Sequence, residues 1–100
     1  MTELFHLLRA AGRRIAIATG SSRPSVTPVI DLFDLAPQAL VTSEDVARGK
    51  PHPDLFLLAA ERLGVPPAQC VVVEDSDVGI ECAKRAGMRA LRFFDLDTRL

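Results

Sequence analysis

The chain is 100 residues long, 48% hydrophobic and 25% charged, with a formal net charge of −1. This composition is typical of one ordinary globular domain or part of one, and the interspersed charges argue against a nucleic-acid-binding surface. No apolar run approaches the roughly 20 residues that span a bilayer, and residues 1–6 lack the features of a signal peptide. Cys70 and Cys82 lie in apolar segments without metal-ligand spacing. We therefore expect a cytoplasmic protein with reduced, buried cysteines and no membrane or nucleic-acid partner.

Helices and strands are predicted to alternate along the chain. A first helix is expected before Gly12, because four apolar residues repeat there at helical spacing: Leu4, Leu7, Leu8 and Ala11. Later helices are expected at residues 24–33, 53–63 and 76–86. The buried side of the helix at 53–63 is expected to carry Leu55, Phe56, Ala59, Ala60 and Leu63.

Four short apolar runs between these helices are predicted strands: residues 14–19, 39–42, 70–73 and 89–94. Residues 43–52 are expected to form a polar loop, and the tail that starts at residue 95 carries no strong signal. Strands that alternate with helices through short connections predict an α/β fold, with a parallel sheet between two layers of helices. In such a sheet every strand ends at the same edge, which is where open α/β sheets bind ligands.

Two adjacent carboxylates, Glu74 and Asp75, follow the apolar run at residues 71–73. A buried charge is costly unless it is paired or binds a metal, and carboxylate oxygens suit Mg²⁺. The alternative is an ordinary helix start, with Asp75 or Ser76 as the cap and Glu74 incidental. Polar segments that follow the other predicted strands favour a metal site over an ordinary helix start.

One of these segments is the turn after the strand at residues 14–19. Thr19 offers a hydroxyl, and Gly20, Ser21 and Ser22 offer backbone N–H groups ahead of a predicted helix. Such groups can bind an anion, although a serine that merely caps a helix is the commoner outcome of a turn like this.

The other segment is the loop that contains Lys50, which is shaped by Gly49 and Pro51. Lysine often binds phosphate as a point charge, although a loop lysine taken alone is usually just solvated. A lysine, a hydroxyl with backbone amides, and a carboxylate pair at one sheet edge together suit phosphoryl transfer.

Three segments, in this order, resemble motifs of the haloacid dehalogenase superfamily of phosphatases. Residues 15–22 resemble its second motif, residues 49–54 its third and residues 71–80 its fourth. The Lys-Pro-His-Pro-Asp sequence ahead of Glu-Asp-Ser-x-x-Gly-Ile is the most specific part. The resemblance is greatest to the β-phosphoglucomutase-like branch and its small sugar-phosphate phosphatases. It covers nearly the whole chain and implies a Rossmann-like three-layer α/β/α core with a parallel sheet.

The resemblance implies phosphate-binding roles around the second and third motifs. Thr19 and the Gly20 amide would hold the transferring phosphoryl group, with Ser21 and Arg23 close to the substrate. Lys50 would bridge the phosphoryl group and a nucleophilic carboxylate, so Thr19 and Lys50 are the catalytic candidates.

The resemblance also implies a cofactor and a substrate class. Asp75 would ligate Mg²⁺, and Glu74 would support the metal directly or through water. His52 is expected to be structural, and Asp77 to be an acid favoured by the dipole at a helix start. The implied partner is a small phosphorylated metabolite, by analogy a sugar phosphate.

One motif of the family is missing from its expected place. The first motif is an Asp-x-Asp on the central strand, which supplies the nucleophile and the general acid. The Asp-x-Asp at residues 95–97 follows the last predicted strand, and residues 31–34 lie at a helix end. We therefore expect residues 1–100 to be the C-terminal part of a core domain, without the first-motif strand and the cap domain.

The missing strand belongs between the predicted strands at 14–19 and 70–73. Neighbouring strands lie about 4.8 Å apart, so its absence leaves a gap of roughly 9.6 Å or brings the flanking strands together. An open gap leaves buried backbone groups unpaired, which folded proteins avoid. We expect direct pairing of the flanking strands, a partner strand, for example through self-association, or marginal stability.

Three functions are compatible with these features. The first is part of a Mg²⁺-dependent phosphatase or phosphomutase that works through an aspartyl-phosphate, whose nucleophile this chain lacks. The second is a non-catalytic module that binds phosphate or metal. The third is a receiver-like phosphoacceptor domain, in which the acid pair should precede the threonine and lysine, whereas here it comes last. The first is favoured, and the isolated chain is then expected to be inactive.

Overall fold

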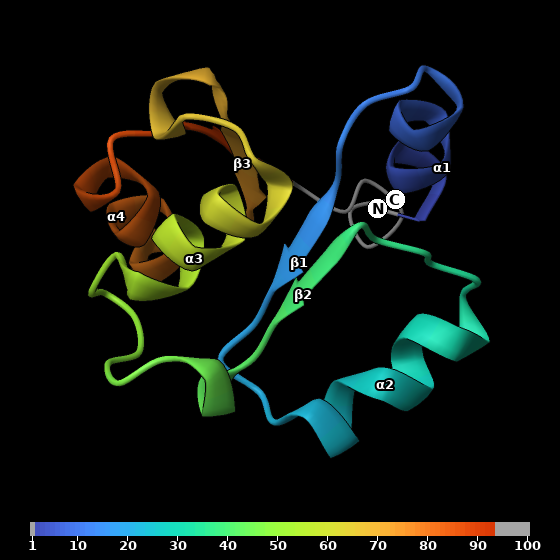
Figure 1. Ribbon diagram of the computed structural model, residues 1–100, viewed down its shortest axis with the longest axis horizontal. Helices are drawn as coiled ribbons and strands as arrows, with labels where there is room; N and C mark the ends of the chain where they lie inside the picture. Colours follow the sequence, from blue (N-terminus) through green and yellow to red (C-terminus); the bar gives the residue numbers. More distant parts are fainter. Residues whose placement is uncertain (1, 94–100) are drawn as a thin grey trace, which may run out of the picture.

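A computed structural model describes residues 2–93 (Figure 1). Helices and strands alternate in the predicted order, which confirms the α/β fold class. The helices are α1 Thr2–Ala10, α2 Arg23–Leu32, α3 Asp54–Leu63 and α4 Asp77–Arg85, and the strands are β1 Ala16–Ala18, β2 Ala39–Val41, β3 Val71–Glu74 and β4 Arg89–Arg92. Two short 3-10 turns, η1 Ser43–Asp45 and η2 Pro67–Gln69, lie in the connections. The strands are shorter than predicted, and residue 94 and the Asp-x-Asp at 95–97 lie outside the described residues.

Local chemistry sets the helix ends close to where the sequence predicts them. Ser22 caps α2 and Ser76 caps α4, because their Oγ atoms accept hydrogen bonds from the backbone N–H groups of Ser25 (3.4 Å) and Gly79 (3.1 Å). α3 ends at Gly64, whose φ of 70° lies in the left-handed region that glycine adopts most easily. The ends of these helices are therefore fixed by the capping residues, and so are the ends of the loops that adjoin them.

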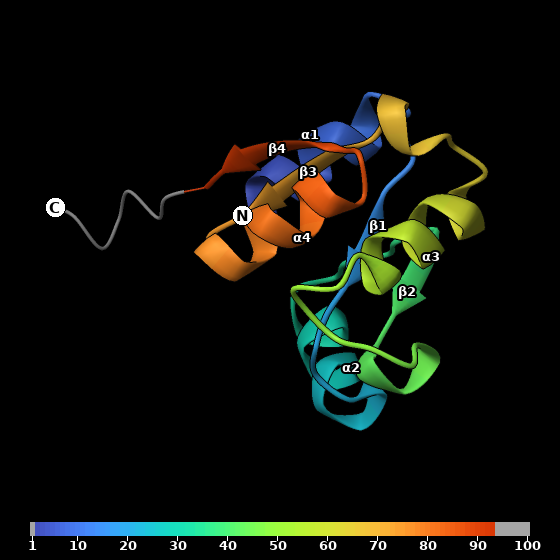
Figure 2. The same cartoon turned by 90° about the vertical axis from the view of Figure 1, so that its left-hand side faces the viewer.

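The strands form two separate parallel pairs. β1 pairs with β2, with Ala16 opposite Ala39, and β3 pairs with β4, with Val71 opposite Arg89. Within residues 2–93, β1 does not pair with β3, so direct pairing, the first of the three expected alternatives, is wrong. Figure 2 shows the pairs running in different directions, β1 and β2 downward and β3 and β4 to the left. One edge of β1 and one edge of β3 therefore make no sheet hydrogen bonds in the described part of the chain.

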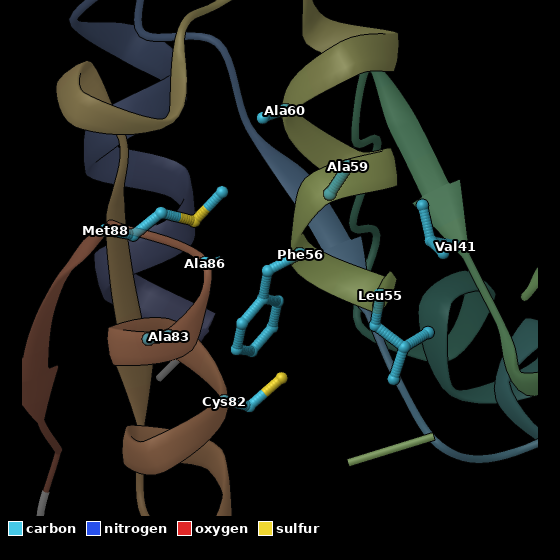
Figure 3. Packing of buried hydrophobic residues seen from close by; sticks show 9 residues of the cluster. All are labelled: Val41, Leu55, Phe56, Ala59, Ala60, Cys82, Ala83, Ala86 and Met88. Atoms are coloured by element: carbon cyan, nitrogen blue, oxygen red, sulfur yellow. The ribbon is translucent and has the colours of Figure 1, made fainter. Parts of the chain in front are cut away.

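One hydrophobic core joins the two strand pairs (Figure 3). α3 packs on β1 and β2, α4 packs on β3 and β4, and side chains of the two helices meet between them. The buried core residues are Val41, Leu55, Phe56, Ala59, Ala60, Cys82, Ala83, Ala86 and Met88. Burial is confirmed for four of the five predicted residues of α3, whereas Leu63 is half-buried. Side chains of α3 and α4 meet in this core, and we attribute the lack of β1–β3 pairing to their burial between the two strand pairs.

α2 lies outside this core. None of its residues is buried, and three apolar side chains at its end are exposed: Val29, Leu32 and Phe33. Figures 1 and 2 show α2 on the opposite side of the β1–β2 pair from α3. No helix in the described range 2–93 is both long enough and apolar enough to cross a membrane.

Candidate functional site

The most buried ion pair of the described residues joins Lys50 and Glu74. Glu74 ends β3, and Lys50 lies in the loop before α3. The Lys50 Nζ lies 3.1 Å from Glu74 Oε2 and 5.4 Å from the centroid of the Phe56 ring. Their side chains are only 20% and 14% exposed. Two of the residues that the sequence predicts at one sheet edge are therefore in direct contact.

The second oxygen of Glu74 is also bonded. Its Oε1 accepts hydrogen bonds from the Asp75 backbone N–H (3.1 Å) and from the Ser76 hydroxyl (3.2 Å). Burial raises the pKa of Glu74, but the hydrogen bond and charge of Lys50, together with the hydrogen bond from the Asp75 backbone N–H, outweigh burial and hold the pKa below its ordinary value of 4.5. Glu74 is therefore ionised and paired at neutral pH.

Gly79 leaves the space that the Glu74 side chain occupies. A Cβ atom at Gly79 would lie 2.1 Å from both Cγ and Cδ of Glu74, far inside van der Waals contact. No role was predicted for Gly79 from the sequence. The sequence did contain a signal for such a role: a glycine inside a helix lowers the stability of the helix, so its presence there usually has a packing reason.

The loop that carries Lys50 is held from two sides. Arg48 donates two hydrogen bonds to the Asp54 carboxylate, at 3.0 and 3.3 Å, which ties the loop to the start of α3. The Cys82 thiol of α4 donates to the backbone oxygen of His52 at 3.1 Å. His52 thus contributes a backbone contact that connects the loop to α4.

The turn after β1 is more open than this loop. Thr19 Oγ1 accepts a hydrogen bond from the Ser21 N–H (3.0 Å), and the Ser21 carbonyl accepts one from the Ser43 N–H (3.1 Å). Thr19 keeps its hydroxyl proton for another acceptor, and the Gly20 N–H makes no hydrogen bond within residues 2–93. In the same range no hydrogen bond or ion pair joins this turn to the Lys50–Glu74 pair.

Two carboxylates that the sequence analysis missed hold the start of α2. Glu44 accepts a hydrogen bond from the Arg23 N–H, and Asp45 Oδ2 lies 3.1 Å from Arg23 Nη2. Asp45 also accepts hydrogen bonds from the N–H (2.8 Å) and hydroxyl (3.1 Å) of the fully buried Thr42. The Thr42 backbone hydrogen bond, opposed by burial, holds the pKa of Asp45 below 3.8. The Thr-x-x-Asp spacing of a capping box was the available signal.

Asp75 is the carboxylate of this edge that remains available to a metal. It is exposed, and its side chain makes no ion pair or hydrogen bond with other described residues. Its backbone oxygen accepts from Arg92 (3.3 Å), whose guanidinium also pairs with Asp77. The described residues contain no cluster of three His, Cys, Asp or Glu side chains that could enclose a metal. Mg²⁺ commonly takes one or two carboxylates and completes its shell with water and phosphate, so Asp75 fits as a single ligand.

Asp75 and Asp77 also have Asp-x-Asp spacing, a second occurrence of this pattern besides residues 95–97. Asp77 begins α4 and is paired with Arg92. The second carboxylate of this spacing is therefore engaged by β4, while the first is free at the sheet edge.

Comparison with known proteins places the chain among hydrolases. Residues 1–87 match the haloacid dehalogenase-like hydrolases. Fructose-1-phosphate phosphatase YqaB of Escherichia coli is 45% identical over 83 residues, which are 80% of this chain and 44% of YqaB. Structures of CbbY from Rhodobacter sphaeroides, with phosphate or as a variant with xylulose-1,5-bisphosphate, match with a TM-score of 0.84 at 35% identity, over 90% of this chain and 42% of CbbY. β-Phosphoglucomutase from Clostridium difficile, 22% identical over 95% of this chain and 43% of that protein, shares the fold with a TM-score of 0.81.

These matches confirm the resemblance that the three sequence motifs indicated. The chain spans less than half the length of the relatives it matches, for example 44% of YqaB and 42% of CbbY. The matched part includes all three motifs, at residues 15–22, 49–54 and 71–80. The chain belongs to the haloacid dehalogenase-like hydrolase family.

Proposed function

We propose that the chain is the C-terminal part of a Mg²⁺-dependent phosphatase or phosphomutase for a small phosphorylated metabolite, such as a sugar phosphate. The observation that carries this proposal is the buried Lys50–Glu74 pair beside the free Asp75 carboxylate, in a member of a hydrolase family. Relatives named for fructose 1-phosphate and solved with xylulose-1,5-bisphosphate support the substrate class. Such an enzyme would work in the cytoplasm.

The phosphoryl group would be bound by charge and by hydrogen bonds. The Lys50 ammonium would neutralise it, and because Glu74 already fixes the ammonium, little reorganisation would be needed. The Thr19 hydroxyl would donate one hydrogen bond and the Gly20 N–H another, while the Ser21 N–H keeps Thr19 Oγ1 in place. Ser21 itself would lie at the rim of this anion site.

Asp75 and Glu74 would bind the metal ion. Asp75 would hold Mg²⁺, with Glu74 supporting the metal directly or through water, and the bound ion would neutralise charge on the phosphoryl oxygens. The nucleophilic carboxylate would come from a strand beside β1 that is not among these residues. The isolated chain is therefore expected to bind phosphate without turnover, and the strand edges that stay unpaired within residues 2–93 offer a route to self-association.

The first test is to read the coding DNA upstream of the Met1 codon in frame. An open frame for an apolar strand that ends in Asp-x-Asp supports the proposal, and the longer protein should then release phosphate from fructose 1-phosphate only with Mg²⁺. Lys50→Ala should abolish this release, whereas Lys84→Ala, an exposed lysine on α4, should retain it. A stop codon directly upstream contradicts the enzymatic role and favours a non-catalytic phosphate-binding module.

A further inference from the structure

A buried cysteine of α4 makes a contact that the proposed chemistry does not use. Cys82 has no exposed surface, and its Sγ lies 3.1 Å from the backbone oxygen of His52, two residues after Lys50. The other cysteine, Cys70, is half-buried, and its Sγ lies 3.5 Å from the Pro66 oxygen, far along the chain from this loop. The two thiols therefore contact different segments.

The loop around His52 is poor in hydrogen-bond donors of its own. Pro51 and Pro53 flank His52, and neither has an N–H group. Within residues 2–93, the hydrogen bond to the His52 oxygen comes from Cys82. Burial raises the pKa of the Cys82 thiol above its ordinary value of 9.0, so the thiol is protonated at neutral pH and can donate.

We propose that Cys82 is a positioning residue for Lys50, because its S–H group holds the Pro-His-Pro segment against α4. The same helix accommodates Glu74 through Gly79, so α4 sets the position of both members of the Lys50–Glu74 pair. A loop displacement of about 1 Å is enough to carry the 3.1 Å contact of this pair out of hydrogen-bonding distance. The inference rests on the proposed function only for its effect on phosphate transfer, since the accessibility of Lys50 can be measured without turnover.

The chain contains its own reference for such a measurement. Lys50 and Lys84 are its lysines, and Lys84 is exposed on α4 while Lys50 is largely buried in the ion pair. Trace acetylation with acetic anhydride followed by mass spectrometry gives the ratio of labelling at Lys50 to labelling at Lys84. In Cys82→Ala this ratio should rise about two- to fivefold, as expected for the loss of one weak hydrogen bond that restrains the loop.

Further variants separate the hydrogen bond from packing and control for the loss of a thiol. Cys82→Ser keeps a donor and should return the ratio close to that of the parent chain. Cys70→Ala removes a thiol that contacts another segment and should leave the ratio unchanged. Thermal melting establishes that each variant is folded, and Cys82→Val, which lacks a donor but fills similar space, serves if Cys82→Ala does not fold.

The proposal is overturned if the donor-free variants keep the parent ratio, or if Cys82→Ser shows the same rise as Cys82→Ala. Failure of the proposed function is a separate result, because it appears as absent phosphate release from the longer protein. A rise confined to the donor-free variants supports Cys82 as a positioning residue whatever the substrate is.

Discussion

The Lys50–Glu74 pair and the Thr19–Ser21 turn are both candidate phosphate-binding groups, but the fold holds them in different ways. The pair is largely buried and lies against the core that α3 and α4 share. The turn is largely exposed and leads into α2, which buries none of its residues and is held by Glu44 and Asp45. Packing therefore positions one half of the candidate site, whereas hydrogen bonds and charges position the other.

The largest expected contrast is between two leucines, one in each region. Leu55 is fully buried in α3, whereas Leu32 at the end of α2 is 77% exposed. Leu55→Ala should lower the free energy of unfolding by about 2–5 kcal/mol, because it removes buried methyl groups and leaves a cavity. Leu32→Ala should change it by less than about 0.5 kcal/mol. Urea denaturation measures both, and equal losses would show that α2 is packed in solution.

A pair of glycine substitutions sharpens the comparison. Gly79→Ala should lower the free energy of unfolding by about 1–3 kcal/mol, because the new methyl group displaces Glu74 from its partners. Gly20→Ala meets nothing within 4 Å and should stay within about 0.5 kcal/mol of the parent. The same denaturation experiment compares them, and a harmless Gly79→Ala would mean that Glu74 can move aside freely.

The ion pair itself can be broken by a substitution that keeps most of the packing. Lys50→Met preserves an apolar contact with Phe56 but leaves the Glu74 carboxylate without its cation, which should cost about 1–3 kcal/mol of unfolding free energy. Lys84→Met is the matched control on the surface and should be close to neutral. If both variants have the same stability, the pair contributes nothing measurable.

The smallest change in stability at neutral pH is expected for Asp45, which holds the start of α2, and its contribution is best measured at acidic pH. The pKa of Asp45 is lower in the folded chain than in the unfolded chain, so its stabilising contribution is complete above about pH 4 and is lost as the pH falls through the folded value. Asp45→Asn removes this titration. Its melting temperature should therefore fall less steeply than that of the parent below pH 4, as thermal melts at stepped pH would measure; parallel curves would contradict the assignment.

The features that were predictable from the sequence depend on local chemistry. Gly64 ends α3, and Ser22 and Ser76 cap helices, because these residues act within a few positions of themselves. The sequence also predicted that the Lys50 loop and Glu74 lie close together, and they do, although they come from two separate strand pairs and not from one sheet edge.

The features that were not predictable depend on contacts between segments that are far apart in the sequence. β1 and β3 do not pair, and side chains of α3 and α4 share one core, neither of which a periodic pattern in the sequence records. Likewise, Glu44 and Asp45 can bind Arg23 only because η1 lies beside the start of α2. Whether Thr19, Gly20, Lys50 and Asp75 act together on phosphate stays a prediction.

The split sheet has a consequence for the order in which this chain folds. Each strand pair joins strands that are consecutive in the sequence, through the single helix between them. Contacts between residues close in sequence form quickly, because little chain entropy is lost in closing the loop. We therefore expect each half to form its own ladder first, and the contact of Phe56 with the α4 side of the core to form later.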